Sequence, residues 1–393
     1  MNQNSQRLYF LDWIRICAFF LLILYHTGMY YVTWDWHVKS PFASDAIEPL
    51  MMLSSPWRLS LLFLVGGVAS AFLMKKLAGG AFLRERSKRL LLPLLFGMVF
   101  IVPPQPYYEV VEKLNYAGSY ADFMGLYFKA YHGFCKNGGC LDLPTWNHLW
   151  FVAYLWIYTM VLGCIAAVFG ARRLERASDW LDGQLRGWKM IVLPVLFLAT
   201  VRITLKDLSF HNGALVDDWF SHFTYFGVFM CGVLMATRHR FWEGAEALRF
   251  ATLGIALTCW AAIVIANSAP GIPDAWSPVF RTIYASCQWC AILAVCGFGR
   301  RHLNFDSAKR RYLTQAVFPV YITHQTLIVV IAHNIKPAGV APAIEGFILV
   351  VLTLTLSFGI FEAVRRVPLL RPFFGLGKES AAQAVPAPLQ NAA

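Results

Sequence analysis

Three ionisable side chains, Asp12, Arg15 and His26, lie in an apolar segment near the N-terminus. In an α-helix, the eleven-residue step from Arg15 to His26 would place both on one face, about 20° apart around the axis and roughly 16 Å apart along it. Histidine can accept a proton near neutral pH, and arginine can pair with an anionic group. The pattern therefore indicates a general base and a cation on one helix face. An Asp12–Arg15 ion pair and a packing hydrogen bond from His26 would also explain it.

Five more polar or aromatic residues lie in other apolar segments. Arg58 belongs to the second segment, and His148 and Trp150 open a later one within His-Leu-Trp-Phe. Tyr321 and His324 belong to Tyr-Ile-Thr-His-Gln-Thr. Ionisable side chains inside a membrane are costly and are therefore functional candidates. Solvation at the membrane interface is the simpler explanation for residues near segment ends, and it fits His324 least well.

Two arginines precede the third apolar segment in the sequence Arg86-Ser-Lys-Arg89. A helical turn would place both guanidinium groups on one side, where they could bind a phosphate through paired hydrogen bonds. The same residues could instead fix the membrane orientation or contact anionic lipids. Spacing alone favours this second interpretation.

The composition identifies the setting of these residues. Of the 393 residues, 58% are apolar and 14% are charged, and the mean hydropathy is +0.52. A soluble domain has about 45–50% apolar and about 25% charged residues, so the composition excludes a cytosolic enzyme, a disordered scaffold and a disulfide-rich secreted module. The net charge of +12 does not indicate nucleic acid, because the basic residues lie in short loops between apolar runs. The sequence predicts a polytopic membrane protein.

About ten segments reach the length of roughly 20 apolar residues that a bilayer requires. We predict an all-α fold, a polytopic transmembrane helical bundle in a lipid bilayer. A single membrane domain would cover residues 1–378, and the Ala/Pro-rich segment 379–393 would be a disordered cytoplasmic tail. The predicted spans cover residues 8–31, 50–74, 90–111, 147–170, 188–205, 214–237, 250–267, 275–299, 312–333 and 343–364.

The distribution of basic residues predicts the orientation. Most Lys and Arg residues fall in alternate segments that include both tails, so the positive-inside rule places both termini in the cytoplasm. The first apolar segment carries Asp12 and Arg15 and is not followed by a small-residue cleavage site, so we expect a retained helix rather than a signal peptide. The segments predicted to be external hold only Lys39, Lys113, Lys129, Lys136, Lys206 and Lys336.

Most of the nine cysteines lie inside apolar segments, where a thiol packs as a small apolar side chain. Cys135 and Cys140 instead lie in the longest external segment, where an oxidising compartment would allow a disulfide. The sequence leaves open whether this bond forms. It shows no ligand spacing typical of a metal site and no glycine pattern typical of nucleotide binding. We therefore expect no metal and no tightly bound cofactor.

Taken together, these motifs resemble the acyltransferase-3 family of integral membrane O-acyltransferases. The resemblance rests on Arg15 and His26 in the first helix, on Arg86-Ser-Lys-Arg89, on His148-Leu-Trp-Phe and on the ten-span plan, and it runs from about residue 8 to residue 375. Within the family the chain is most similar to the glucan biosynthesis protein C branch, which succinylates periplasmic glucans. The stretches that carry this closer similarity are Tyr9–Asp12, Trp36–Ser40, Leu303–Lys309, Tyr321–His324 and Arg366–Leu370.

The resemblance implies an enzyme of the bacterial inner membrane that transfers an acyl group, such as succinyl or acetyl, from cytoplasmic acyl-CoA to a hydroxyl of an extracytoplasmic glycan. The phosphates of acyl-CoA would bind beside Arg86 and Arg89, and its pantetheine arm would follow the line from Arg15 to His26. His26 would act as the general base, or would carry the acyl group covalently.

The remaining candidates take supporting roles on this interpretation. Arg15 would orient the donor, and His148 and His324 would polarise the thioester carbonyl or line the acceptor side. Substrate-binding roles fall to Trp150, Arg58 and Tyr321.

Two other classes of protein remain compatible with the sequence. A proton-coupled transporter or a flippase of a glycan or lipid-linked sugar would also bury Arg, His and Asp, although the sequence has no inverted repeat. A structural or sensory membrane protein would not need such costly polar groups. The oligomeric state, the acyl group and the exact acceptor are not determined by the sequence.

Overall fold

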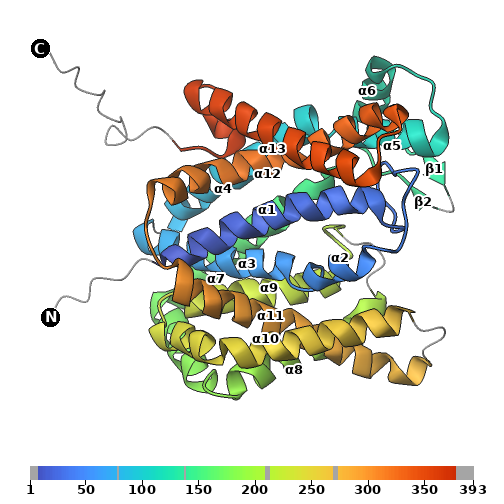
Figure 1. The fold of residues 1–393 in the computed structure, drawn as a ribbon. Coiled ribbons are helices and arrows are strands. Elements are labelled where there is room, and N and C mark those ends of the chain that lie inside the picture. The colour runs from blue at the N-terminus through green and yellow to red at the C-terminus, as the bar shows by residue number, and fades with distance from the viewer. Residues whose placement is uncertain (1–7, 78, 137–138, 209–212, 269–272, 378–393) are drawn as a thin grey trace, which may run out of the picture.

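The computed structural model describes residues 8–77, 79–136, 139–208, 213–268 and 273–377, so the predicted tail at 379–393 lies outside the described residues. Long helices dominate, packed side by side in one bundle (Figure 1). These helices are α1 (Tyr9–Tyr31), α3 (Arg58–Lys76), α4 (Gly79–Phe96), α7 (Trp150–Gln184), α8 (Lys189–Leu205), α9 (Trp219–Met235), α10 (His239–Ser268), α11 (Ser277–Leu303), α12 (Ala308–Ile335) and α13 (Pro342–Arg366).

The apolar helices agree with a membrane bundle. Seven helical segments of the described residues are long and apolar enough to cross a membrane, and an eighth would be the bent pair Gly79–Ile101 and Pro104–Leu114. Helix α9 is apolar but shorter, and α8 ends in a turn that carries Lys206 and Asp207. The all-α class is therefore confirmed, whereas ten spans and cytoplasmic termini stay predictions.

Two predicted spans are interrupted at prolines. The span at 50–74 divides into α2 (Glu48–Ser54) and α3, with Pro56 in the break. The span at 90–111 passes from α4 through a π-helical turn (Gly97–Ile101) into α5 (Pro104–Leu114), with a 42° bend. Proline has no N–H to donate and its ring clashes with the preceding turn, so both breaks have a local cause.

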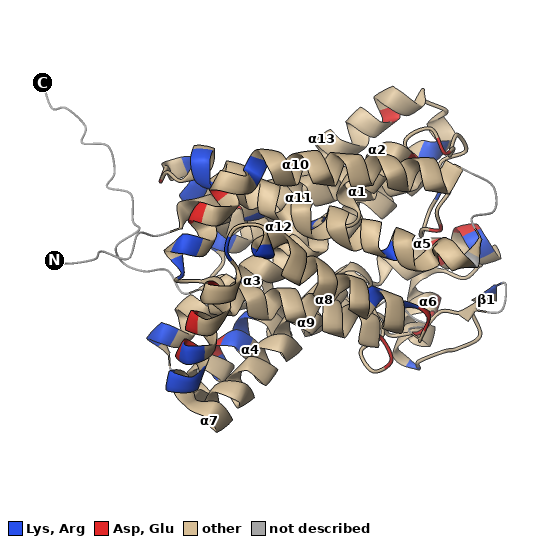
Figure 2. Ribbon diagram, turned by 90° about the horizontal axis from the view of Figure 1, so that it is seen from below, with Lys and Arg blue, Asp and Glu red and all other residues tan. Residues whose placement is uncertain are grey.

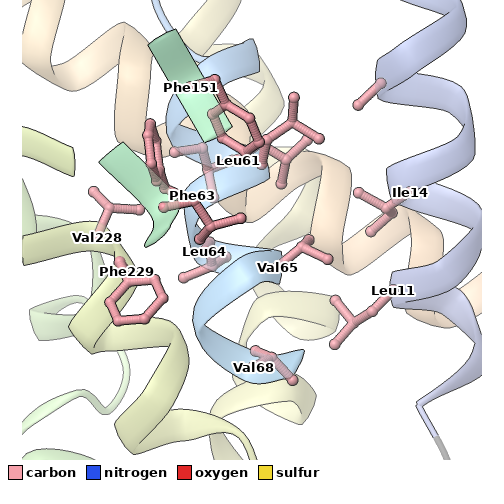
Figure 3. Packing of buried hydrophobic residues seen from close by; sticks show 14 of the residues in the cluster. Leu11, Ile14, Leu61, Phe63, Leu64, Val65, Val68, Phe151, Val228 and Phe229 are labelled. Carbon is pink, nitrogen blue, oxygen red and sulfur yellow. The ribbon is translucent and has the colours of Figure 1, made fainter. Parts of the chain in front are cut away.

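The core lies where α1, α3, α7 and α9 meet. Phe63 and Phe151 pack with ring centroids 4.6 Å apart, next to Phe229 (Figure 3). At this crossing α3 and α9 touch through glycines, because a Cβ on Gly67 would lie 2.0 Å from the Phe229 carbonyl oxygen, and one on Gly232 would lie 2.1 Å from that of Leu64. Small residues at helix crossings allow this close backbone packing in membranes.

The two ends of the bundle differ in charge. Lys and Arg gather at the end where α1 begins and α13 ends, which we call the basic end, whereas acidic and basic residues are mixed at the opposite end around α5 and α6 (Figure 2). The opposite end also holds α6 (Tyr120–Phe128), capped by Ser119 and Asp122, and the hairpin of β1 (Cys135–Lys136) and β2 (Gly139–Cys140). The Cys135–Cys140 disulfide, left open by the sequence, closes this hairpin.

Candidate active site

A pair of histidines from α1 and α12 lies inside the bundle. Nδ1 of His26 is 2.9 Å from Nε2 of His324, and the two rings are nearly parallel with centroids 5.1 Å apart. His324 is fully buried. Residues 298 positions apart in the sequence therefore form one hydrogen-bonded pair.

The surroundings of His324 determine which nitrogen of each ring carries hydrogen. Nδ1 of His324 lies 2.6 Å from the carbonyl oxygen of Tyr321, and because a carbonyl only accepts, this nitrogen donates. A neutral His324 then has its lone pair on Nε2, so Nδ1 of His26 donates to it. The lone pair of His26 is left on Nε2, which has no hydrogen-bond partner among the described residues. This is the arrangement of an oriented general base.

His148 lies beside the pair but has both ring nitrogens occupied. Nε2 donates to the carbonyl oxygen of Ile322 at 3.0 Å, and Nδ1 accepts from the side-chain amide of Gln105 at 3.2 Å. The hydroxyl of Tyr321 donates to the carbonyl oxygen of His148 at 2.5 Å. These bonds hold α12 against the start of α7, so the geometry favours a positioning role for His148 over proton transfer.

A hydrogen-bonded network, which sequence reasoning missed, continues from the pair toward α5. The amide of Gln325, next to His324, donates to Nε2 of His37 at 3.0 Å and to Oε1 of Gln105 at 3.0 Å. His37 in turn donates from Nδ1 to Glu109 at 2.5 Å. The sequence signals were the polar run that follows Tyr321 and the stretch Trp36–Ser40, which contains His37, whereas Gln105 lies inside the predicted span 90–111, where no motif marked it.

A cavity of about 330 Å³ lies on the other side of the pair, toward the basic end. Its walls combine the three arginines Arg15, Arg86 and Arg89 with apolar side chains of α1, α3, α7 and α12. Phe19 lines the cavity, and its ring centroid is 5.2 Å from that of Tyr321, which itself contacts His324 at 5.7 Å. The cavity therefore ends one aromatic layer short of the histidine pair.

The two arginines of the predicted phosphate site differ in their contacts. Arg86 donates to the hydroxyl of Thr159 at 3.3 Å, and its Nε is buried without a hydrogen-bond partner among the described residues. Arg89 is half exposed and pairs with Glu85 at 2.6 Å. Both line the same cavity, so the α4 turn does bring them to one side, as the Arg-x-x-Arg spacing predicted.

Arg15 is held by an ion-pair chain between α1 and α12. Asp12 accepts from Arg15 at 3.5 Å and also from Arg310, a fully buried residue that sequence reasoning missed. Arg310 also donates to Asp306 at 2.7 Å, and this bond holds the pKa of the Asp306 carboxyl below its usual value. The predicted Asp12–Arg15 pair is thus part of a larger group that fixes Arg15 at the cavity.

Two predicted residues contact aromatic side chains rather than the two histidines. Trp150 packs against Tyr154 and Tyr225, with centroids 5.0 and 5.7 Å away. Arg58 lies over the ring of Tyr25, with its central carbon 3.3 Å from the ring centroid. The structure therefore groups His26, His324, His148 and Tyr321 in one cluster, places Arg15, Arg86 and Arg89 in one cavity, and leaves Trp150 outside both. In the described part of the chain, no group of three or more His, Cys, Asp or Glu side chains could hold a metal ion.

Comparison with known proteins places the chain in a family. Residues 8–362 match the family model described as "Acyltransferase domain" (Acyl_transf_3). The chain is also similar to the glucans biosynthesis protein C of Escherichia coli K12 and of strain SMS-3-5, each 24% identical over 382 residues that cover 94% of both chains. No solved structure matches the chain.

Proposed function

The chain belongs to the acyltransferase family whose model matches residues 8–362, and from this premise we propose that it moves an acyl group from cytoplasmic acyl-CoA to a hydroxyl of a glycan outside the bacterial inner membrane. A glycan acceptor is proposed because the similar E. coli proteins are named for glucan biosynthesis. The observation that best supports this proposal is the order of two features along one face of α1. The arginine-lined cavity comes first, and the histidine pair follows it.

The donor end of the proposal rests on the basic end of the cavity. Arg86 and Arg89 supply positive charge for the phosphates of coenzyme A, and arginine binds phosphate through paired, charge-assisted hydrogen bonds. The narrow pantetheine arm would extend past Arg15 and Phe19 toward the histidines. A small movement of the Phe19 and Tyr321 rings would bring the thioester to His26.

The chemical step follows from the hydrogen positions of the pair. Nε2 of His26 takes the proton of the acceptor hydroxyl while that oxygen attacks the thioester carbonyl carbon. The new C–O bond forms, the C–S bond breaks, and the departing thiolate of coenzyme A receives the proton from His26. His324 steadies the positive charge on His26 because its Nε2 accepts from Nδ1, and the Tyr321 carbonyl keeps His324 in that tautomer.

The network beyond the pair would face the acceptor. Gln105, Gln325 and His37 lie on the side of the histidines opposite the donor cavity, toward the end that holds α5 and α6. Hydroxyl-rich ligands such as glycans are bound by amide, imidazole and carboxylate groups of this kind. Donor and acceptor would thus reach His26 from opposite sides of the membrane.

The test is a mass comparison of periplasmic glucans and surface polysaccharides from three strains: one with the gene, one without it, and one carrying His26→Ala. We expect a mass increment of one acyl group that requires both the gene and His26. A fourth strain, which carries His132→Ala, is the matched control, because this change affects an exposed histidine. Its glycans should show the same mass increment as those of the strain with the unchanged gene. Identical glycans in all strains, together with no transfer from labelled acyl-CoA in inverted vesicles, would contradict the proposal and favour a transporter.

Whether His26 carries the acyl group is a separate question. A covalent route would release coenzyme A from acyl-CoA in a single turnover without acceptor. The general-base mechanism proposed above requires acceptor for this release, and a burst of free coenzyme A in its absence would overturn it.

A further inference from the structure

The segment that follows α13 forms part of the wall of the arginine-lined donor cavity. It contains the short helix η6 (Arg371–Phe374) and then Gly375, Leu376 and Gly377, all three of which line the cavity. We call residues 371–377 the C-terminal turn. It contacts α4 and α12 at the basic end, where α13 ends (Figure 1). Because the family model matches residues 8–362, the turn lies beyond the matched part of the chain.

Aromatic packing and one arginine hold the C-terminal turn in place. Phe374 is buried, and its ring centroid lies 5.5 Å from that of Phe96, the last residue of α4. Arg371 donates from Nε and Nη2 to the carbonyl oxygen of Gly377 at 3.0 and 2.8 Å, and from Nη1 to that of Arg365 at 2.8 Å. A single guanidinium therefore ties the end of the turn to the end of α13.

Two glycines allow the turn to pack against Arg89. Gly375 has a φ of +67°, a conformation that favours glycine, and a Cβ there would lie 3.2 Å from the carbonyl oxygen of Arg89. A Cβ on Gly377 would lie 3.5 Å from Nη2 of Arg89, and Nε of the same guanidinium donates to Glu85 at 2.6 Å. Gly377 and Glu85 therefore confine the guanidinium of Arg89 from two sides.

This confinement bears on how tightly Arg89 can bind an anion. The side chain of Arg89 is 50% exposed, and a long side chain at the surface loses rotamer entropy when a ligand immobilises it. A guanidinium that the fold already holds beside the cavity loses less of this entropy, so more of the interaction energy appears as affinity. The turn can therefore strengthen phosphate binding without contacting the phosphate through a charged group of its own.

Building on the function proposed above, we propose that the C-terminal turn is a donor-binding element in which Arg371 and Gly377 position Arg89 for the phosphates of coenzyme A. Arg371 is a positioning residue, because it acts through the carbonyl groups that it holds. Gly377 contributes by having no side chain where the Arg89 guanidinium lies. Donor affinity then depends on a segment beyond the residues that the family model matches, and the Arg86-Ser-Lys-Arg89 motif alone does not determine it.

The test is a double-mutant cycle between the turn and Arg89. The affinity of the full-length protein for labelled coenzyme A is measured by equilibrium dialysis in nanodiscs of a zwitterionic phospholipid. No acceptor is present, so the result does not depend on transfer, and no anionic lipid competes for the arginines. Arg89→Gln should lower the affinity by about 10-fold, because a charged partner of the phosphates is lost.

The variants of the turn should lower the affinity only while Arg89 is present. We expect losses of about 10-fold in Gly377→Val, whose methyl groups would crowd the guanidinium, and in Arg371→Gln, whose shorter side chain cannot bond both carbonyl groups. In the Arg89→Gln background each of these changes should cost less than about 2-fold, because interacting residues are not additive.

Two controls separate this effect from bulk and from charge. Gly377→Ala should keep the wild-type affinity, since a Cβ alone at this position makes an ordinary contact with Arg89. Arg366→Gln removes a positive charge from the same end of α13, where Arg366 pairs with Glu362 at 3.3 Å, and should also keep it. A loss in Arg366→Gln equal to that in Arg371→Gln would show that net charge acts, and would overturn the positioning role.

The outcomes distinguish this inference from the function on which it rests. Losses of equal size with and without Arg89, or unchanged affinity in Gly377→Val and Arg371→Gln, would overturn the role of the turn and leave the acyltransferase proposal intact. Failure of the wild type to bind coenzyme A would overturn both. The thermal midpoints of the two turn variants are measured alongside, and a loss of affinity that follows a lower midpoint in both backgrounds would indicate a structural role instead.

Discussion

At the scale of single residues, the hydrogen-bond chain Tyr321–His324–His26 leaves the lone pair of His26 on Nε2, the atom that accepts the proton in the proposed mechanism. In the proposed mechanism His324 acts through His26 rather than on the substrate, since its own nitrogens are occupied by His26 and by the Tyr321 carbonyl. The two histidines are therefore expected to contribute unequally to the rate.

Replacing His26 by Ala should lower kcat by about 10³-fold, because the proposed general base is removed. His324→Ala should lower it by about 10²-fold, because His26 loses the acceptor that fixes its tautomer. His324→Gln should recover part of this loss, since the amide oxygen can accept from Nδ1 of His26. Steady-state rates with labelled acyl-CoA measure all three variants, and equal losses in all three would contradict the positioning role of His324.

The arginines at the cavity mouth should act on donor affinity rather than on the chemical step. The double change Arg86→Gln and Arg89→Gln removes two charges from the cavity and should raise KM for acyl-CoA by about 10-fold or more, with a smaller effect on kcat. Arg84→Gln on the same helix changes an exposed arginine and is the matched control. A loss of expression or of membrane orientation at unchanged KM would show that the pair serves topology alone.

At the scale of elements, α3 is the helix on which the site depends most. It carries Arg58 and the cavity wall on one face, and on another it touches α9 through Gly67. Gly67 and Gly232 set the distance between the backbones at this crossing, so the α3 wall of the cavity keeps its position only if the crossing stays tight.

Gly67→Val should destabilise the protein by about 3 kcal/mol, since a side chain there would press on the carbonyl of Phe229, and backbone cannot move aside cheaply. The measurement is the thermal midpoint in detergent together with the folded yield. Gly254→Val in α10 is the control, because its Cβ would meet no atom within 4 Å. Equal midpoints for the two variants would contradict the close crossing of α3 and α9.

At the scale of the whole molecule, the bundle separates two environments. The basic end carries the arginine-lined cavity, and the opposite end carries the polar network, α6 and the disulfide hairpin (Figures 1 and 2). This polarity suits transfer across a membrane only if the basic end faces the cytoplasm.

The orientation can be tested with single cysteines at two exposed lysines. Lys129→Cys near α6 should react with a membrane-impermeant maleimide on intact spheroplasts, whereas Lys88→Cys in α4 should react only after permeabilisation. Both changes are made in a variant that carries Cys17→Ser and Cys164→Ser. These two replacements remove exposed free thiols that could also react with the maleimide. Labelling of Lys88→Cys on intact spheroplasts would contradict the predicted orientation.

The sequence by itself determined the properties that depend on local pattern. Apolar length and the helical repeat predicted the positions of the long helices, and the shared face of Arg15 and His26 follows from the repeat alone. The resemblance to the acyltransferase family, which the family match confirms, rested on the same short motifs. The prolines at the two interrupted spans can be read from the sequence. Because membrane helices also tolerate proline, the sequence did not predict that these spans would break.

Only the tertiary structure decided which helices are neighbours. His26 meets His324 across 298 residues, Arg310 reaches Asp12 across the same separation, and Trp150 turns away from the histidine that precedes it by two positions. These pairings depend on how the long helices pack against one another, and side-chain packing between distant segments leaves no periodic signal in the chain. For the same physical reason, the contact between Arg58 and Tyr25 is visible only in the folded chain.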